Sequence, residues 1–113
     1  MRNDREISKL DPNWVTGFVD GEGCFHVTIT QQKDRKLGIG VQPQITIGLH
    51  EKEKALLEEI KNFFSVGKIY KQRPHIIQLR FESIIEIEEV IKHFNKYQLK
   101  TKKLADLKLF PPP

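Results

Sequence analysis

The stretch from Trp14 to Phe25 constrains the fold most, because it has the pattern of a short apolar helix that breaks at glycines. Two acids, Asp20 and Glu22, stand where this helix should end. A helix C-terminus carries partial negative charge and disfavours carboxylates by ~0.3–1 kcal/mol each, so another group must compensate. A hard divalent cation would do so, since Mg²⁺ and Ca²⁺ take oxygen ligands from carboxylates, backbone carbonyls and water.

Two glycines in the same stretch point in the same direction. Gly17 and Gly21 are four residues apart and therefore lie on one face of the helix. Glycine inside a helix costs roughly 1 kcal/mol relative to alanine, but a face without side chains lets another backbone approach closely. A core helix with a glycine C-cap is the ordinary alternative. That alternative explains the apolar periodicity and leaves the two acids unexplained.

The sequence VTGFVDGEG, from Val15 to Gly23, resembles the LAGLIDADG motif of homing endonucleases, and the following Cys24 and Phe25 also fit. The resemblance extends over residues 13–110 and includes Gln44 and the late segment LKTKKLADLKLF. Nine motif residues alone are moderately specific. Together with the downstream elements in the correct order, they identify the chain as similar to this family.

Composition limits the class of protein and its partners. The 113 residues suit one domain near the size at which oligomerisation becomes useful, and the net charge of +4 favours an anionic partner such as nucleic acid. One cysteine permits no internal disulfide and indicates a reducing compartment, and no apolar run is long enough for a membrane span. No targeting segment is recognisable at the start of the chain. The resemblance implies an organelle, mitochondrion or chloroplast, that encodes its own intron.

The pattern along the chain predicts an α+β fold with the order αββαββα. Residues 1–10 are expected to form a flexible tail, 11–110 a single domain, and 111–113 a C-terminal tail or an engineered end. Asp11 and Pro12 predict the start of the motif helix, which should run to about Asp20. The other helices are expected at 51–64, 83–97 and 101–110, and the strands at 24–32, 38–49, 67–72 and 75–82.

Alternation within these elements predicts which side chains are buried. Phe25, Val27 and Ile29 should point inward from the first strand, and Pro43 predicts that the second strand lies at an edge or has a bulge. The second helix should bury a stripe formed by Ala55, Leu56, Ile60, Phe63 and Phe64. A four-stranded antiparallel sheet with all helices on one face would then leave its other face exposed.

The side chains expected on that exposed face are donors and acceptors of moderate charge. Each one alone is also typical of an ordinary solvated strand, but Gln and Arg bond bidentately to adenine and guanine, and a β-ribbon fits the DNA major groove. The resemblance likewise implies a saddle-shaped sheet on double-stranded DNA, with basic turn residues on phosphates. The predicted DNA-binding residues are His26, Thr28, Thr30, Gln32, Lys33, Arg35, Lys36, Gln42, Gln44, Thr46, Lys68, Tyr70, Gln72, Arg73, Gln78 and Arg80.

The resemblance also implies the site of chemistry. Phosphodiester hydrolysis needs an activated water and stabilisation of the departing oxygen, which metal ions held by carboxylates supply. By correspondence with the motif, Glu22 and the carbonyl of Gly21 are the metal ligands, and Asp20 has a structural role. Glu22, Gln44 and Lys103 are the candidate catalytic residues, although Lys103 has the ordinary alternative of a solvated lysine. The expected cofactor is Mg²⁺, with Ca²⁺ supporting binding without cleavage.

Only one motif is present, and in this family that implies a homodimer acting on a near-palindromic site. The predicted interface consists of Trp14, Gly17, Phe18 and Gly21. The sequence leaves open a complete homodimeric enzyme, an engineered chain, or one half of a two-motif enzyme. The predicted function is a site-specific, Mg²⁺-dependent DNA endonuclease. The alternative is a nucleic-acid-binding module without cleavage, such as a maturase that binds intron RNA or an inactive half-domain.

Overall fold

The computed structural model describes residues 10–31 and 39–108, and its strands form one antiparallel sheet with the order β1-β2-β4-β3. Every strand boundary lies within one residue of the sequence prediction. The strands are β1 (Gly23–Gln31), β2 (Ile39–His50), β3 (Lys68–Arg73) and β4 (Ile76–Phe81). The two predicted hairpins are therefore confirmed, since β1 pairs with β2 and β3 pairs with β4.

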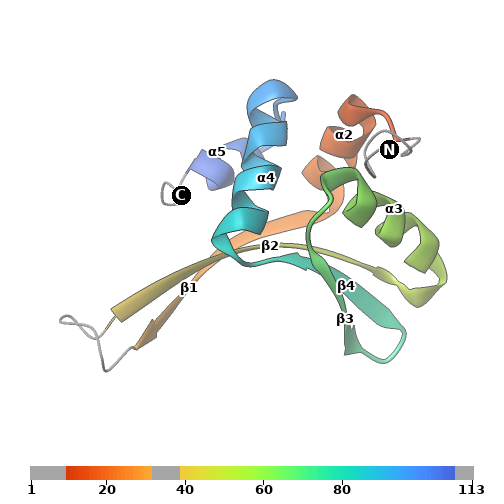
Figure 1. Cartoon of the computed structure of the whole chain (residues 1–113), viewed down its shortest axis with the longest axis horizontal. Coiled ribbons are helices and arrows are strands. Elements are labelled where there is room, and N and C mark those ends of the chain that lie inside the picture. The colour runs from red at the N-terminus through yellow and green to blue at the C-terminus, as the bar shows by residue number, and fades with distance from the viewer. Residues whose placement is uncertain (1–9, 32–38, 109–113) are drawn as a thin grey trace.

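The described helices all lie on one side of this sheet, and the opposite face is left uncovered (Figure 1). None of them is long and apolar enough to cross a membrane. The helices are α2 (Pro12–Glu22), α3 (Lys54–Phe64), α4 (Ile84–Lys96) and α5 (Lys103–Lys108), with a 3₁₀ turn, η1 (Glu51–Glu53), before α3. The predicted α+β fold and its αββαββα order are confirmed.

Strand β2 is the longest strand and changes its neighbours along its length. It pairs with β1 from Ile39 to Ile47, whereas its pairing with β4 begins only at Ile45. Pro43 lies opposite Val27 of β1, in the part of β2 that has no second neighbour among the described strands. A residue without an N–H is tolerated at such a position. The prediction of an edge at Pro43 therefore holds locally, although β2 is an interior strand further along.

The core lies between the helices and the covered face of the sheet. Its largest fully buried side chains are Phe64, Phe81, Phe94, Ile45, Ile47, Leu57, Ile60, Leu79, Leu99, Val15, Val19 and Val90. In α3 the predicted stripe was partly wrong, because Ala55 is exposed and Leu57 is completely buried. Leu57, Ile60 and Phe64 are three and four residues apart, which is the spacing of one helical face. Adjacent leucines make that face ambiguous in the sequence.

The β1–β2 hairpin extends beyond the layer of helices (Figure 1). Val27, which was expected to point inward, is 39% exposed for this reason. Alternation along a strand predicts which side a residue faces, but only a covering element buries it. Val27 therefore lies on the opposite side of the strand from His26, as the alternation predicts, but it is not part of the buried core.

A capping box formed by Ser83 and Glu86 holds the start of α4 against the sheet. The Ser83 hydroxyl accepts the backbone N–H of Glu86, and the Glu86 carboxylate accepts the backbone N–H groups of Ser83, Glu82 and Gly67. Gly67 has a φ of 107°, and a Cβ there would lie 2.8 Å from the Phe81 ring. Only glycine fits this turn without displacement. The capping box thus also positions the beginning of β3.

Candidate functional site

Helix α2 has two faces of opposite character. The buried inner face consists of Val15, Thr16, Val19 and Asp20. On the outer face Trp14 is 43% exposed, and its ring stacks on Phe18 with the ring centroids 5.1 Å apart. Among the residues that the structure describes, a Cβ atom at Gly17 or Gly21 would meet no atom within 4 Å outside its own stretch of helix. The outer face therefore offers a flat glycine surface beside two stacked aromatic rings.

The carboxylate of Asp20 is buried at the end of this inner face, with 7% of the residue exposed. It accepts the backbone N–H of Lys100 at 2.6 Å, and the N–H and hydroxyl of Thr101 at 3.1 and 2.6 Å. Burial alone would raise the pKa of Asp20, but these hydrogen bonds and the nearby Lys103 ammonium together lower it. Asp20 therefore ties α2 to the segment that precedes α5 as an ionised carboxylate.

Lys103, at the first position of α5, also contacts the end of α2. Its Nζ donates to the backbone carbonyl oxygen of Asp20 at 2.7 Å, and its side chain is half-buried. A cation beside the last carbonyls of a helix is favourable because these carbonyls carry partial negative charge. Lys103 is therefore hydrogen-bonded to α2 rather than fully solvated, and its catalytic role stays a prediction. For Asp20, the backbone and side-chain donors of Lys100 and Thr101 provide the compensation that the sequence assigned to a cation.

Glu22 differs, because it is exposed and its carboxylate has no hydrogen-bond or ion-pair partner among the described residues. It is the last residue of α2, directly after Gly21 of the open glycine surface. Carboxylate and backbone carbonyl oxygens are suitable ligands for a hard cation. Within the described ranges, no group of three or more His, Cys, Asp or Glu side chains is arranged to hold a metal.

The uncovered face of the sheet carries most of the predicted DNA-binding side chains for which the structure describes a position. Exposed or half-buried there are His26, Gln42, Gln44, Lys68, Tyr70, Gln72, Gln78 and Arg80, and Arg73 is exposed at the end of β3. The cross-strand pairs His26 with Gln44, Lys68 with Arg80, and Tyr70 with Gln78 place them on a common face. The uncovered face therefore combines side chains from all four strands.

Several predicted residues do not contribute to this description. Gln32, Lys33, Arg35 and Lys36 lie outside the described residues, and at Thr28 and Thr30 only the backbone is described. Thr46 was expected to be exposed, but only 4% of this residue is accessible to solvent. It lies at the middle of the sheet between Cys24 of β1 and Arg80 of β4. A short side chain in that position is surrounded by neighbouring strands on both sides.

A hydrogen-bonded network crosses the uncovered face near the end of β4. The Oε1 of Gln44 lies 2.7 Å from the Nε2 of His26, and the Nε2 of Gln44 donates to the Glu82 carboxylate at 3.0 Å. Because an amide oxygen only accepts, His26 donates its Nε2–H in this arrangement. Gln42 donates to the backbone carbonyl of Glu82 at 2.7 Å. Both ends of the Gln44 amide are thereby oriented.

Glu82 was absent from the predicted site. The signal was nevertheless present, since Glu82 continues the outward alternation of Gln78 and Arg80 and is an acid in an otherwise amide-rich and basic set. Within the described residues, no hydrogen bond links the side chain of Gln44 to Glu22 or Lys103. The three predicted catalytic residues therefore divide between the end of α2 and the uncovered sheet face.

A second connection links α2 to the end of α4, and the sequence pattern did not predict it. The hydroxyl of Thr16 donates to the backbone carbonyl of Tyr97 at 2.8 Å and lies 2.9 Å from the Nε2 of His93. Since the hydroxyl proton is used for Tyr97, the His93 ring donates to the Thr16 oxygen. The ring of His93 is also packed edge-on against Phe64. This contact and that of Asp20 hold the inner face of α2 at both its middle and its end.

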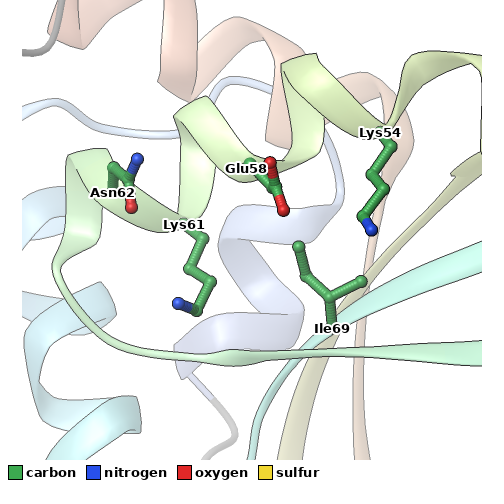
Figure 2. A pocket seen from close by; sticks show the side chains of 5 residues that line it. All are labelled: Lys54, Glu58, Lys61, Asn62 and Ile69. Carbon is green, nitrogen blue, oxygen red and sulfur yellow. The ribbon is translucent and has the colours of Figure 1, made fainter.

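A hollow of about 530 Å³ lies between α3 and β3 (Figure 2). Lys54, Glu58, Lys61 and Asn62 of α3 and Ile69 of β3 line it, and its lysines lie on either side of the acid. None of the predicted catalytic, metal-binding, DNA-binding or interface residues contributes to this lining. The candidate site is instead made of a helix end and an open sheet face.

Comparison with known proteins assigns this arrangement to a class. The model of the LAGLIDADG endonuclease family matches residues 15–112. Probable intron-encoded endonuclease 2 of Neurospora crassa is 41% identical over 104 residues, which cover 89% of this chain and 23% of that relative. The chain thus spans about a quarter of this curated relative.

Solved structures have the same fold. The homing endonuclease I-TnaI superposes with a TM-score of 0.84 at 37% identity, covering 88% of this chain and 67% of that chain. I-SmaMI bound to an uncleaved DNA target in the presence of calcium ions superposes with a TM-score of 0.85 at 35% identity, covering 89% and 35%. The fold is therefore that of the homing endonucleases. The chain belongs to the LAGLIDADG endonuclease family.

Proposed function

We propose that this chain is a site-specific endonuclease domain that hydrolyses double-stranded DNA with Mg²⁺ as a homodimer on a near-palindromic site. The observation that carries the proposal is the exposed Glu22 carboxylate at the end of the open Gly17 and Gly21 surface of α2. Family membership and a DNA-bound structure of a similar protein support it. An intron-encoded relative supports an origin in an intron, and we propose that the intron is that of an organelle.

The open surface of α2 fits a second copy of the same helix. Two helices can approach closely where their facing residues have no side chains, as at Gly17 and Gly21. The stacked rings of Trp14 and Phe18 would add buried apolar area to such an interface. Parallel pairing about a two-fold axis that runs along the helices would then place the Glu22 carboxylate of one copy beside that of the other.

The oxygen donors at the end of α2 fit a hard divalent cation. We assign the Glu22 carboxylate and the Gly21 carbonyl as its ligands from each copy. When bound, the cation activates a water and stabilises the departing oxygen of the phosphodiester. Calcium in the DNA complex of I-SmaMI supports a divalent cation, and the assignment of Mg²⁺ is part of the proposal.

The other two candidate residues have different positions and therefore different roles. Lys103 holds its ammonium on the Asp20 carbonyl, two residues before Glu22 in the helix. A positive charge there favours the additional negative charge that develops on a phosphate during hydrolysis. Gln44 is oriented by His26 and Glu82 on the sheet and is assigned to contacting the DNA beside the cleaved bond.

The experiment that tests the proposal compares Glu22→Gln with the unaltered chain. In Mg²⁺, we expect cleavage of sequences selected from a near-palindromic duplex library to fall by more than about a hundredfold. DNA binding in Ca²⁺ should remain largely intact. Glu59→Gln is the matched control, because Glu59 is an exposed helical acid on α3. This variant should cleave DNA like the unaltered chain.

The outcomes separate the two candidate functions. Unchanged cleavage by Glu22→Gln would overturn the proposed metal site. Binding without any cleavage by the unaltered chain would instead assign the alternative, a nucleic-acid-binding module. Sedimentation over a range of concentrations tests the homodimer directly, because a monomer at every concentration would leave Glu22 without its symmetry-related partner.

A further inference from the structure

Arg80 has an unusual position on the uncovered face. It lies in the middle of β4, directly opposite Thr46 of β2 and Lys68 of β3, and its side chain is half-buried. Like charges placed directly opposite each other destabilise a strand pair. No ion pair joins Arg80 or Lys68 to an acid in the described ranges, and the Glu82 carboxylate is engaged by Gln44. The fold itself gains nothing evident from this concentration of positive charge.

The guanidinium of Arg80 is nevertheless held in a defined orientation. Its central carbon lies 4.4 Å from the centroid of the Tyr70 ring, which is cation–π distance. Its Nε donates to the Oε1 of Gln78 at 2.6 Å. Tyr70 and Gln78 are themselves directly opposite each other on β3 and β4. Stacking fixes the plane of the guanidinium, and the Nε hydrogen bond fixes its rotation within that plane.

This arrangement leaves the two terminal nitrogens as donors. Neither has a hydrogen-bond partner among the described residues. Two parallel N–H groups on a rigid plane match the O6 and N7 acceptors of guanine in the major groove, whereas the ammonium of lysine is a point charge. Backbone phosphates also accept from arginine, but a phosphate contact does not require the side chain to be oriented in advance.

We infer that Arg80 reads one guanine in the major groove of each half-site, and that Tyr70 and Gln78 are the positioning residues that orient it. This inference rests on the proposed DNA binding and adds to it the identity of one base. Lys68, directly opposite Arg80 on β3, is a point charge without a fixed plane, so we expect it to contribute affinity with little sequence preference.

The test is selection of bound duplexes in Ca²⁺ from a library randomised in both half-sites, followed by sequencing, for the full chain and its variants. The unaltered chain should show a position with a strong preference for guanine. In Arg80→Lys that preference should fall by about five- to hundredfold, with the other positions unchanged. Tyr70→Ala and Gln78→Ala should relax the same position, and Tyr70→Phe, which keeps the ring, should not.

Lys68→Ala is the matched control, because it removes a charge from the same face without removing a bidentate donor. It should weaken binding to all sequences alike and reduce the salt dependence by about one counterion. Equal and uniform losses in Arg80→Lys and Lys68→Ala would overturn the inference while leaving DNA binding intact. No binding of any duplex by the unaltered chain would overturn the proposed function together with it. If Arg80→Lys disturbed folding, the Tyr70 and Gln78 variants would give the same decision.

Discussion

The inner and outer faces of α2 end in two acids with opposite surroundings. Asp20 is buried and accepts three hydrogen bonds from Lys100 and Thr101, whereas Glu22 is exposed and has no partner among the described residues. Residues two apart on a helix point to different sides, so adjacent acids in one motif can serve different purposes. The comparison separates the carboxylate that stabilises the fold from the one that is exposed at the end of the same helix.

The largest expected effect on stability comes from removing the buried acid. Asp20→Ala should lower the free energy of unfolding by about 2–4 kcal/mol, because the backbone N–H groups of Lys100 and Thr101 lose their acceptor in a buried site. Urea denaturation measures this change. Glu22→Ala is the matched variant on the exposed side and should change stability by no more than about 0.5 kcal/mol. Equal losses in both variants would remove the distinction between the two faces.

Acid conditions should reveal the same carboxylate. Hydrogen bonds outweigh the effect of burial and lower the pKa of Asp20, and the pKa of Glu86 is lowered in the same way. A carboxyl whose pKa is lower in the folded state contributes stability above its ordinary pKa of about 4, and this contribution is lost as the pH falls through the folded value. Asp20→Asn should therefore flatten the decline of stability below about pH 4, as measured by denaturation across pH. An unchanged decline would contradict an ionised, hydrogen-bonded Asp20.

A smaller loss is expected in the middle of the inner face. Thr16→Val keeps the shape of the side chain but removes the hydroxyl that contacts Tyr97 and His93. The free energy of unfolding should fall by about 1–2 kcal/mol, since the partly buried carbonyl of Tyr97 loses its donor. Thermal or urea denaturation provides the measurement. A neutral result would mean that water or a neighbouring group replaces the hydroxyl.

The outer face should respond in the opposite direction. Gly17→Ala should raise the stability of the isolated chain by up to about 1 kcal/mol, because the added methyl group meets open space and alanine favours a helix. The same change should weaken self-association if this face pairs with a second copy. Gly23→Ala is the control, since its Cβ would lie 2.8 Å from Val19 and should destabilise. Denaturation at low concentration and sedimentation measure the two effects separately.

Local sequence patterns were sufficient to predict much of the fold. The capping box at Ser83, the proline at the start of α2 and the alternation in β4 each depend on neighbours within a few residues. Exposure was harder to predict, because Val27 lies in a hairpin without a covering helix and Thr46 lies between two strands. Burial depends on what packs above a residue, and that information is spread along the whole chain.

The sequence alone determined that one helix has a face of glycines and two acids near its C-terminal end. Composition and spacing within a dozen residues specify such an element. Only the tertiary structure decided which acid is buried. The donors to Asp20 come from residues about 80 positions away, as do the partners of Thr16. The orientations of Gln44 and Arg80 were likewise decided by neighbouring side chains in the folded sheet. Spacing specifies a local element, whereas contacts between distant segments form only when the sheet and its helices pack together.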